Sequence, residues 1–502
     1  MKGIPMMKKL KKILTRNVTL ILGIILLASV SGGCAIKPDD PVETYVPWNS
    51  SDNIMIVTPE KGNNTYPTAD DPGLYTDGPQ VPTGNVPSAT SGPSDNTPVK
   101  TSAPSTDVPA TQKPTDEPAP TVKPTDGPQG SIPDNTPKYG DSEFAQMVSI
   151  PGREEEVYCV TLDKNKEYWD CPVSKLGHIF VHNLVAFPEL DLAINPKSSW
   201  HDWNNTTVEY VRLLESIYEK GYVLIDANYI FDYQYRDGRL IANLKKSVKL
   251  PKGKTGVIIS CDNVCFPENE HGTGRVDKIV VYNGHIASYT YFDDGTEEYS
   301  YERDVCDITE QFCLKHPDFS FAGARLMLAC SGNAGILGYR TDDSYASKGY
   351  DVEKERAQAR EVIKYLKEHG FYFGCHSYAH LDLNSLTGAK LDKEFNSWNT
   401  QVKPLIGYTP FYVYPFGNWV EAETEQYKRL VSEGFHVMYG TSMNEILVNG
   451  TYQHRDVGNI YGERFIYCGK TMIAYAKNGT FDKYGDVYEL YDNDGRYIKL
   501  YR

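Results

Sequence analysis

Two histidines four residues apart, His376 and His380, are the side chains of this sequence most suited to chemistry. They lie in the segment HSYAH, directly after the apolar run FYFGC at 371–375, which predicts a short buried strand. On one helical turn, two imidazoles at this spacing point the same way and can bind one metal ion. Two structural histidines with satisfied hydrogen bonds have the same spacing, so the pair alone leaves both interpretations open.

Polar residues also stand at the end of a second apolar run, where VIIS at 257–260 is followed by Cys261, Asp262 and Asn263. A carboxylate at the tip of a buried strand is typical of active sites on parallel strands, although such a pair also forms ordinary Asx turns. A third segment, YVYPFGN at 412–418, has a Pro-aromatic-Gly turn after another strand. That turn either shapes a groove or only reverses the chain.

Strand and helix patterns alternate from Glu143 onward and would bring these segments together. Helical spacing closed by a glycine predicts helices at 206–221, 351–370 and 421–434. The Asn283-Gly284 pair predicts a β-hairpin within 278–292. Apolar runs predict buried strands at 178–187, 222–226, 255–264, 325–330, 371–375, 411–417 and 436–440. This alternation predicts an α/β fold, a β/α barrel with its chemistry at the carboxyl ends of the strands.

The N-terminus has the composition of a secretory targeting segment. Residues 1–34 carry six basic and no acidic side chains around a 13-residue apolar run at 18–30. The run is shorter than the roughly 20 residues that span a bilayer, so a signal peptide is expected. Its end at Cys34 resembles a bacterial lipobox, with Ser31 where a leucine is usual, and this resemblance implies lipidation of Cys34. An ordinary cleaved signal and an uncleaved anchor are the alternatives, and each places the body outside the cytoplasm.

A proline-rich segment separates this region from the body. Residues 35–142 hold 20 of the chain's 31 prolines and a near-repeat, KPTD, at 113–116 and 123–126. Proline removes backbone donors and few large apolar side chains are present, so we expect a disordered, extended Pro/Thr/Ser/Asp-rich spacer. A tail without a function has the same composition.

Charge and cysteine content exclude some classes of protein. The formal net charge is -15, whereas a nucleic-acid binder needs a basic face, so no nucleic-acid partner is expected. The ten cysteines show no paired CxxC spacing, which argues against zinc fingers.

In their order along the chain, the three polar segments resemble the motifs of the polysaccharide deacetylase (NodB-homology) family, carbohydrate esterase family 4. Ser260-Cys261-Asp262-Asn263 stands for the first motif, His376 to His380 for the second, and Pro415-Phe416-Gly417 for the third. The stretch at 316–341 is similar to a clostridial branch of that family. The resemblance covers about residues 175–470 and implies a distorted (β/α) barrel of the NodB-homology type over residues 143–502.

The resemblance also implies roles for single residues. Asp262 would be the general base, and His376 and His380 would be two ligands of a divalent metal, Zn²⁺ in the first place. Asn263 stands where the family has a carboxylate ligand, so the ion would be weakly held by a neutral amide oxygen.

Substrate contacts follow from the third motif, where Tyr414, Pro415 and Phe416 would line the acetyl pocket, with the Tyr414 backbone N–H near the oxyanion. The family's general acid has no secure match, and His436 and His454 are the remaining C-terminal candidates.

The expected function is metal-dependent removal of acetyl groups from a polysaccharide of the peptidoglycan, chitin or xylan type. The expected partners are this acetylated polymer and, through lipid on Cys34, the extracellular face of the cell membrane. Because Asn263 replaces a ligand, the alternative is a catalytically impaired protein of the same fold that binds cell-surface glycan. A wall protein without a ligand is a third possibility, which the complete His-x-x-x-His disfavours.

Overall fold

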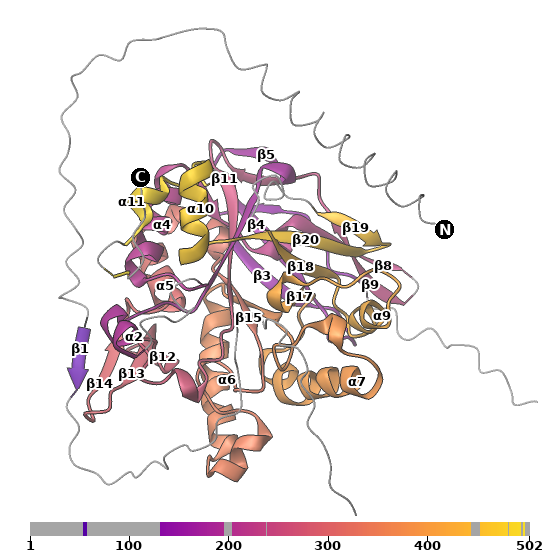
Figure 1. Cartoon of the computed structure of the whole chain (residues 1–502). Coiled ribbons are helices and arrows are strands. Elements are labelled where there is room, and N and C mark those ends of the chain that lie inside the picture. The colour runs from indigo at the N-terminus through magenta and orange to yellow at the C-terminus, as the bar shows by residue number, and fades with distance from the viewer. Residues whose placement is uncertain are drawn as a thin grey trace, which may run out of the picture. The chain divides into compact units, whose positions relative to one another are not determined.

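The computed structural model describes residues 54–57, 131–194, 203–236, 238–442, 452–479, 481–492 and 495–496 (Figure 1). The expected signal peptide with Cys34 and most of the expected spacer at 35–142 lie outside these residues. Within the described ranges, no helix combines the length and the apolar character needed to cross a membrane.

A closed barrel of parallel strands forms the centre of the fold, which confirms the predicted α/β barrel (Figure 1). Pairing of β11 with β15 joins the two ends of the strand series and closes the ring. In their order around the barrel, the strands are β6 (Gly177–His182), β11 (Thr255–Asp262), β15 (Met327–Cys330), β16 (Tyr372–Cys375), β17 (Phe411–Val413), β18 (Val437–Ser442) and β20 (Asn459–Ile466). Short β7 (Tyr222–Leu224) pairs with the start of β11, and β19 (Gln453–Asp456) runs antiparallel to β20.

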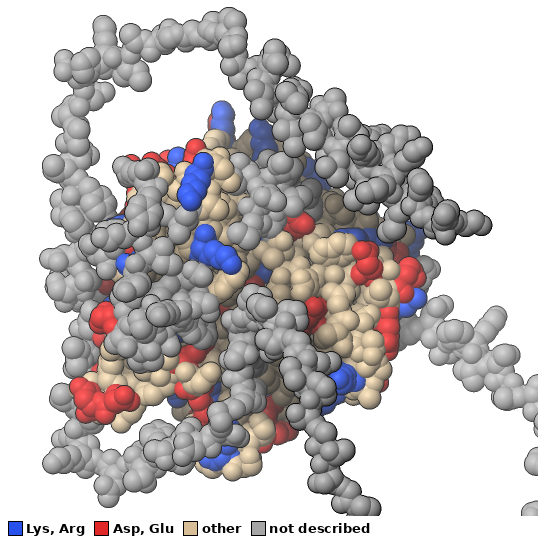
Figure 2. Space-filling view, in the orientation of Figure 1, with Lys and Arg blue, Asp and Glu red and all other residues tan. Residues whose placement is uncertain are grey.

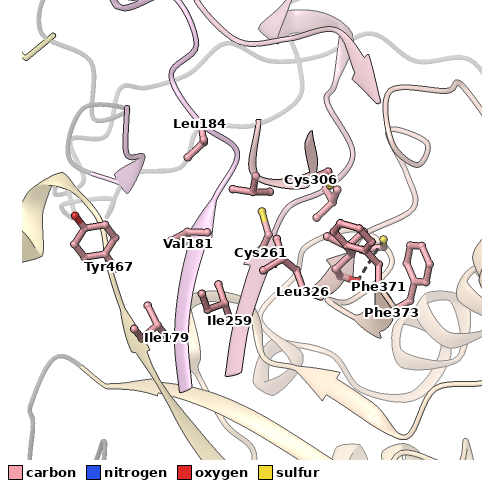
Figure 3. Close-up of a cluster of buried hydrophobic side chains, with 14 of the residues drawn as sticks. Ile179, Val181, Leu184, Ile259, Cys261, Cys306, Leu326, Phe371, Phe373 and Tyr467 are labelled. Atoms are coloured by element: carbon pink, nitrogen blue, oxygen red, sulfur yellow. Dashed lines mark hydrogen bonds between the residues drawn. The ribbon is translucent and has the colours of Figure 1, made fainter. Parts of the chain in front are cut away.

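The wall of the barrel separates an inner hydrophobic core from an outer one, because successive side chains of a strand point to opposite faces. Ile259 and Cys261 of β11 face outward with Ile179 and Val181 of β6, into the layer under the helices (Figure 3). Ile258, which directly precedes Ile259, faces the barrel interior. By the same alternation, Asp262 points inward, which carries its carboxylate away from the apolar outer layer.

Helices cover the outside of the barrel. They are α2 (Pro188–Ile194), α4 (Thr207–Glu219), α5 (Val305–Lys315), α6 (Val352–Glu368), α7 (Gly388–Ser397), α8 (Lys403–Ile406), α9 (Glu425–Ser432), α10 (Gly469–Asn478) and α11 (Val487–Leu490). The predicted helices at 206–221, 351–370 and 421–434 correspond to α4, α6 and α9. The third begins four residues later than predicted, because the Thr424 side chain caps it by accepting a hydrogen bond from the Tyr427 backbone.

The predicted hairpin is confirmed as an insertion beside the barrel. β12 (Lys278–Tyr282) and β13 (His285–Tyr291) pair antiparallel around Asn283 and Gly284, which both have positive φ. β14 (Glu297–Ser300) continues this sheet, and β1 (Ile54–Val57) adds to its edge.

Small, mostly antiparallel sheets from segments before β6 and between β7 and β11 supply part of the interior core. They comprise β2 (Lys138–Gly140), β3 (Phe144–Ser149) and β4 (Glu156–Asp163), β5 (Tyr168–Pro172) with β10 (Ser247–Pro251), and β8 (Phe231–Arg236) with β9 (Arg239–Leu244). The first of these strands precedes the boundary at 143 that composition predicted. On the face shown in Figure 2, basic and acidic side chains are interspersed over a largely uncharged surface.

Candidate active site

The carboxyl ends of the parallel strands bring the predicted polar segments to one mouth of the barrel. β11 ends at Asp262, and His376 follows the last residue of β16. β6 ends at His182, which is the register partner of Asp262 on the neighbouring strand. Because register partners on adjacent strands point to the same face, His182 and Asp262 share the inner face of the barrel.

Asp262 forms a buried ion pair with Arg464 of β20. The two guanidinium nitrogens of Arg464 donate to Oδ1 and Oδ2 at 2.6 and 2.8 Å. Only 2% of Asp262 and 1% of Arg464 is exposed, so water screens this pair little. Burial by itself raises the pKa of Asp262, but the Arg464 charge outweighs it and holds the pKa of this carboxyl well below its usual range. Asp262 is therefore a carboxylate at neutral pH.

Contacts with Ser260 and Phe180 hold the Arg464 guanidinium in place. One of its guanidinium nitrogens also donates to the Ser260 hydroxyl at 3.1 Å, and its guanidinium carbon lies 4.2 Å from the centre of the Phe180 ring. The Ser260 hydroxyl lies 3.1 Å from Nε2 of the buried His178. These contacts leave the guanidinium little freedom to turn away from Asp262.

His376 is held as a neutral imidazole with one defined tautomer. Its Nδ1 lies 3.0 Å from the carbonyl oxygen of Val413, so this nitrogen carries the proton and donates it. Burial lowers the pKa of His376 to about 3. Its Nε2 lies 3.9 Å from Oδ2 of Asp262, and in this tautomer Nε2 presents a lone pair. The space between Nε2 of His376 and Oδ2 of Asp262 therefore suits a proton or a metal cation, because each of these accepts an electron pair.

His380 lies beside His376, with the ring centres 4.9 Å apart. The prediction that a helical turn brings the two imidazoles together is wrong. Residues 376–382 form a loop, in which Ser377 and His380 adopt φ of 61° and 52°. These left-handed angles are incompatible with a continuous α-helix.

The third predicted segment splits between the core and the site. Phe416 is 54% exposed and its ring centre lies 4.8 Å from that of His380, so it borders the site. Pro415 is buried at the start of the turn that ends β17. Tyr414 is buried in the outer core, where its hydroxyl donates to the sulfur of Met438. Its backbone N–H donates to the Tyr439 carbonyl at 2.9 Å and is therefore not directed at an acetyl oxygen.

Two residues at this mouth, Arg464 and His182, were missed from the sequence. The sequence does contain a signal for each of them. Arg464 stands inside the apolar run NIYGERFIYC, and His182 stands at the end of the apolar run GHIFVH. The His182 ring is half-buried, and its Nδ1 donates to the Trp203 carbonyl at 2.9 Å.

The two histidines considered as acids do not join this group. His436 precedes β18, at the amino-terminal end of the barrel, where its backbone N–H donates to the Pro410 carbonyl. His454 lies on β19 and is exposed.

The residues at the mouth fit a divalent metal only in part. Across the ranges that the structure describes, no three His, Cys, Asp or Glu side chains are grouped so as to hold a metal ion. His376 and His380 can supply two imidazoles, and Asn263, which follows Asp262 with φ of 61°, can supply a neutral amide oxygen. Such a set carries less negative charge than two imidazoles with a carboxylate and should bind Zn²⁺ more weakly.

The cysteines do not replace the missing carboxylate. Cys261, labelled in Figure 3, and Cys375 belong to the outer core between the barrel and its helices. Burial raises the pKa of each thiol well above its usual value, and it raises that of Cys265 to about 12. Cys261 and Cys375 lie on the outer face of the barrel wall, whereas Asp262 points inward.

Residues 342–433 match the polysaccharide deacetylase family model. The matched range contains His376, His380 and the Pro415–Gly417 turn, whereas Asp262 precedes it and Arg464 follows it. No curated protein matches the chain. Among solved structures, the chain is similar to the Streptococcus pyogenes deacetylase PplD in complex with acetate, with 11% identity, a TM-score of 0.31, and coverage of 60% of this chain and 94% of that chain.

Proposed function

We propose that the chain is a hydrolase that removes acetyl groups from a polysaccharide of the peptidoglycan, chitin or xylan type. The observation that carries this proposal is the meeting of Asp262, His376 and His380 at one barrel mouth, with Arg464 fixing the carboxylate. The family match over the histidine loop supports the same reaction class.

In this proposal Asp262 accepts a proton from the attacking water, and Arg464 holds both carboxylate oxygens in place. His182 is the register partner of Asp262 on the neighbouring strand β6. It is the candidate acid that protonates the leaving amine or sugar oxygen. Phe416, exposed next to His380, offers an aromatic face for the sugar ring.

A weakly held divalent ion, Zn²⁺ in the first place, would be bound by His376 and His380 with Asn263. When bound, such an ion acidifies a water molecule and polarises a carbonyl group. The neutral state of His376 suits this role, because a protonated imidazole cannot ligate.

A second candidate function is glycan binding without turnover. It is favoured by the neutral Asn263 and by the lack of a three-ligand His, Cys, Asp or Glu group among the described residues. The two functions share the barrel mouth and differ in whether acetate is released.

The deciding experiment equilibrates the full chain with excess free Zn²⁺ and compares it with Asp262→Asn and His376→Ala. We expect about one equivalent of bound metal in the parent at this Zn²⁺ concentration, much less in His376→Ala, and acetate release from acetylated chito-oligosaccharides only by the parent. Binding of the oligosaccharide with no acetate release at saturating Zn²⁺ would instead establish the glycan-binding protein. Mass spectrometry of the mature chain tests the proposed lipid on Cys34 and hence its position at the extracellular membrane face.

A further inference from the structure

The loop that joins His376 to His380 is built from unfavourable backbone conformations. Ser377 and His380 both have left-handed φ although neither is glycine. Such residues persist only where the surrounding structure holds them, and they are concentrated at functional sites.

Glu394 of α7 contacts nearly every residue between the two imidazoles. Its Oε1 accepts hydrogen bonds from the Ser377 hydroxyl at 2.5 Å, from the Tyr378 backbone N–H at 2.5 Å and from the Ala379 backbone N–H at 3.2 Å. The Ser377 hydroxyl oxygen in turn accepts from the Leu381 backbone N–H at 3.0 Å. One carboxylate therefore fixes the chain from the residue after His376 to the residue after His380.

A carboxylate is unexpected at position 394, on the buried face of α7. Glu394 is 5% exposed, lies on the buried face of α7 with Leu391 and Phe395, and its hydrogen-bond donors are all neutral groups. Burying a carboxylate without a countercharge is unfavourable, so an apolar side chain would pack the helix at lower free energy. The hydrogen bonds to the strained loop are what the carboxylate adds.

The other side of the loop is held independently. The Tyr378 carbonyl accepts from the backbone N–H groups of Gly332 and Asn333, and the Tyr378 hydroxyl donates to Asp342. These contacts anchor Tyr378 from the side of β15, whereas Glu394 sets the turn on either side of it. Removal of Glu394 should therefore let the loop relax without releasing it from the barrel.

We propose that Glu394 is a positioning residue that sets the distance and angle between the His376 and His380 imidazoles. This proposal rests on the proposed function, in which the two imidazoles act together on one ion. Glu394 itself touches neither imidazole in the contacts described above, and it acts through the Ser377–Ala379 backbone.

The test compares the full-length parent with Glu394→Ala, Glu394→Gln and the control Glu310→Gln. Glu310 is a carboxylate of matched burial on α5, and its partner Arg325 precedes β15, at the opposite end of the barrel. Zn²⁺ affinity is measured by competition with a chromophoric chelator, and stability by urea unfolding. We expect Glu394→Ala to lose about 10- to 100-fold in affinity, the usual effect of removing a group that orients metal ligands. Glu394→Gln, which keeps an acceptor oxygen, should lose less.

The control separates positioning from general destabilisation. Glu310→Gln should lower stability and leave Zn²⁺ affinity within about twofold of the parent. If Glu394→Ala binds Zn²⁺ as tightly as the parent, the proposal is overturned. It is also overturned if Glu310→Gln loses as much Zn²⁺ affinity as Glu394→Ala when the two variants are equally destabilised.

The role of Glu394 can be tested even if the proposed metal-dependent function is wrong. If the parent binds no Zn²⁺, the metallohydrolase fails, and the ring ¹⁵N signals of His376 and His380 decide the positioning question. Ring signals that shift in Glu394→Ala and not in Glu310→Gln uphold it, and unchanged ring signals overturn it.

Discussion

Arg464 donates two parallel hydrogen bonds to Asp262 in the barrel interior, where neither residue has more than 2% of its surface exposed. The two residues are 202 positions apart in the sequence, and closure of the barrel through β20 and β6 brings them together. A bidentate arginine fixes the plane as well as the charge of a carboxylate. The reactivity of Asp262 therefore depends on a residue from the last strand of the barrel.

Removal of the cation should destabilise the protein strongly. Arg464→Met leaves the Asp262 carboxylate buried and unpaired, which typically costs about 3–5 kcal/mol of unfolding free energy. Urea unfolding at pH 7 measures the change. The double variant Arg464→Met/Asp262→Asn removes both charges and should recover most of the loss. Equal destabilisation of the single and double variants would contradict the view that the unpaired charge is the cause.

His436 should make stability depend on pH. Burial lowers its pKa to about 4, against the opposing hydrogen bond to Asn459, while Glu155 favours and Arg239 disfavours the protonated ring. The unfolded histidine has a pKa of about 6.5, so the unfolded state binds more protons between about pH 6.5 and pH 4. Stability is therefore full above pH 6.5 and falls as the pH is lowered towards 4.

This difference predicts a loss of about 2 kcal/mol from His436 between pH 7 and pH 5. The measurement is the unfolding free energy of the parent and of His436→Asn at both values. The variant should lack this part of the pH dependence. Parallel pH profiles for the two proteins would show that His436 titrates normally in the folded state.

His182 should be required for turnover and dispensable for metal retention. As the proposed acid, it would contribute roughly 10²- to 10⁴-fold to the rate, and His182→Gln removes the titrating group at similar size. Acetate release from acetylated chito-oligosaccharides and bound Zn²⁺ are measured on the same sample. His454→Gln is the control, because His454 is an exposed histidine outside the site. Unchanged activity in His182→Gln would require another acid.

Six strands of the barrel were predictable because their residues are apolar on both faces, as in TGVIISCD of β11. The polar ends of β11 and β16 were predictable for the same reason, since Asp262 and His376 interrupt apolar runs. The seventh strand, β20, was not predicted, because Glu463 and Arg464 interrupt its apolar run. The loop at 376–380 was not, because its conformation depends on Glu394 from a later helix rather than on local helical propensity. Tyr414 was placed in the site from the resemblance, but strand alternation at the end of β17 directs its ring into the outer core.

Asn263→Asp tests whether the site lacks only one charge. Its φ of 61° is tolerated by aspartate about as well as by asparagine, so the backbone should not change. Repulsion from Asp262 is reduced because Arg464 already neutralises that carboxylate. Without metal, the added carboxyl should have a raised pKa from the remaining like-charge interaction. With Zn²⁺, the negative oxygen should strengthen binding.

We therefore expect Asn263→Asp to bind Zn²⁺ at least about 10-fold more tightly than the parent, and to release acetate faster at limiting Zn²⁺. Asn263→Gly is the matched control, since glycine accepts the same φ and removes the amide, and it should bind more weakly than the parent. Adding His376→Ala to Asn263→Asp should abolish the gain, because one imidazole and one carboxylate make a poor site. Zn²⁺ affinities that are equal across the parent, Asn263→Asp and Asn263→Gly would show that position 263 is not a ligand, and glycan binding without turnover would then be the better account of the chain.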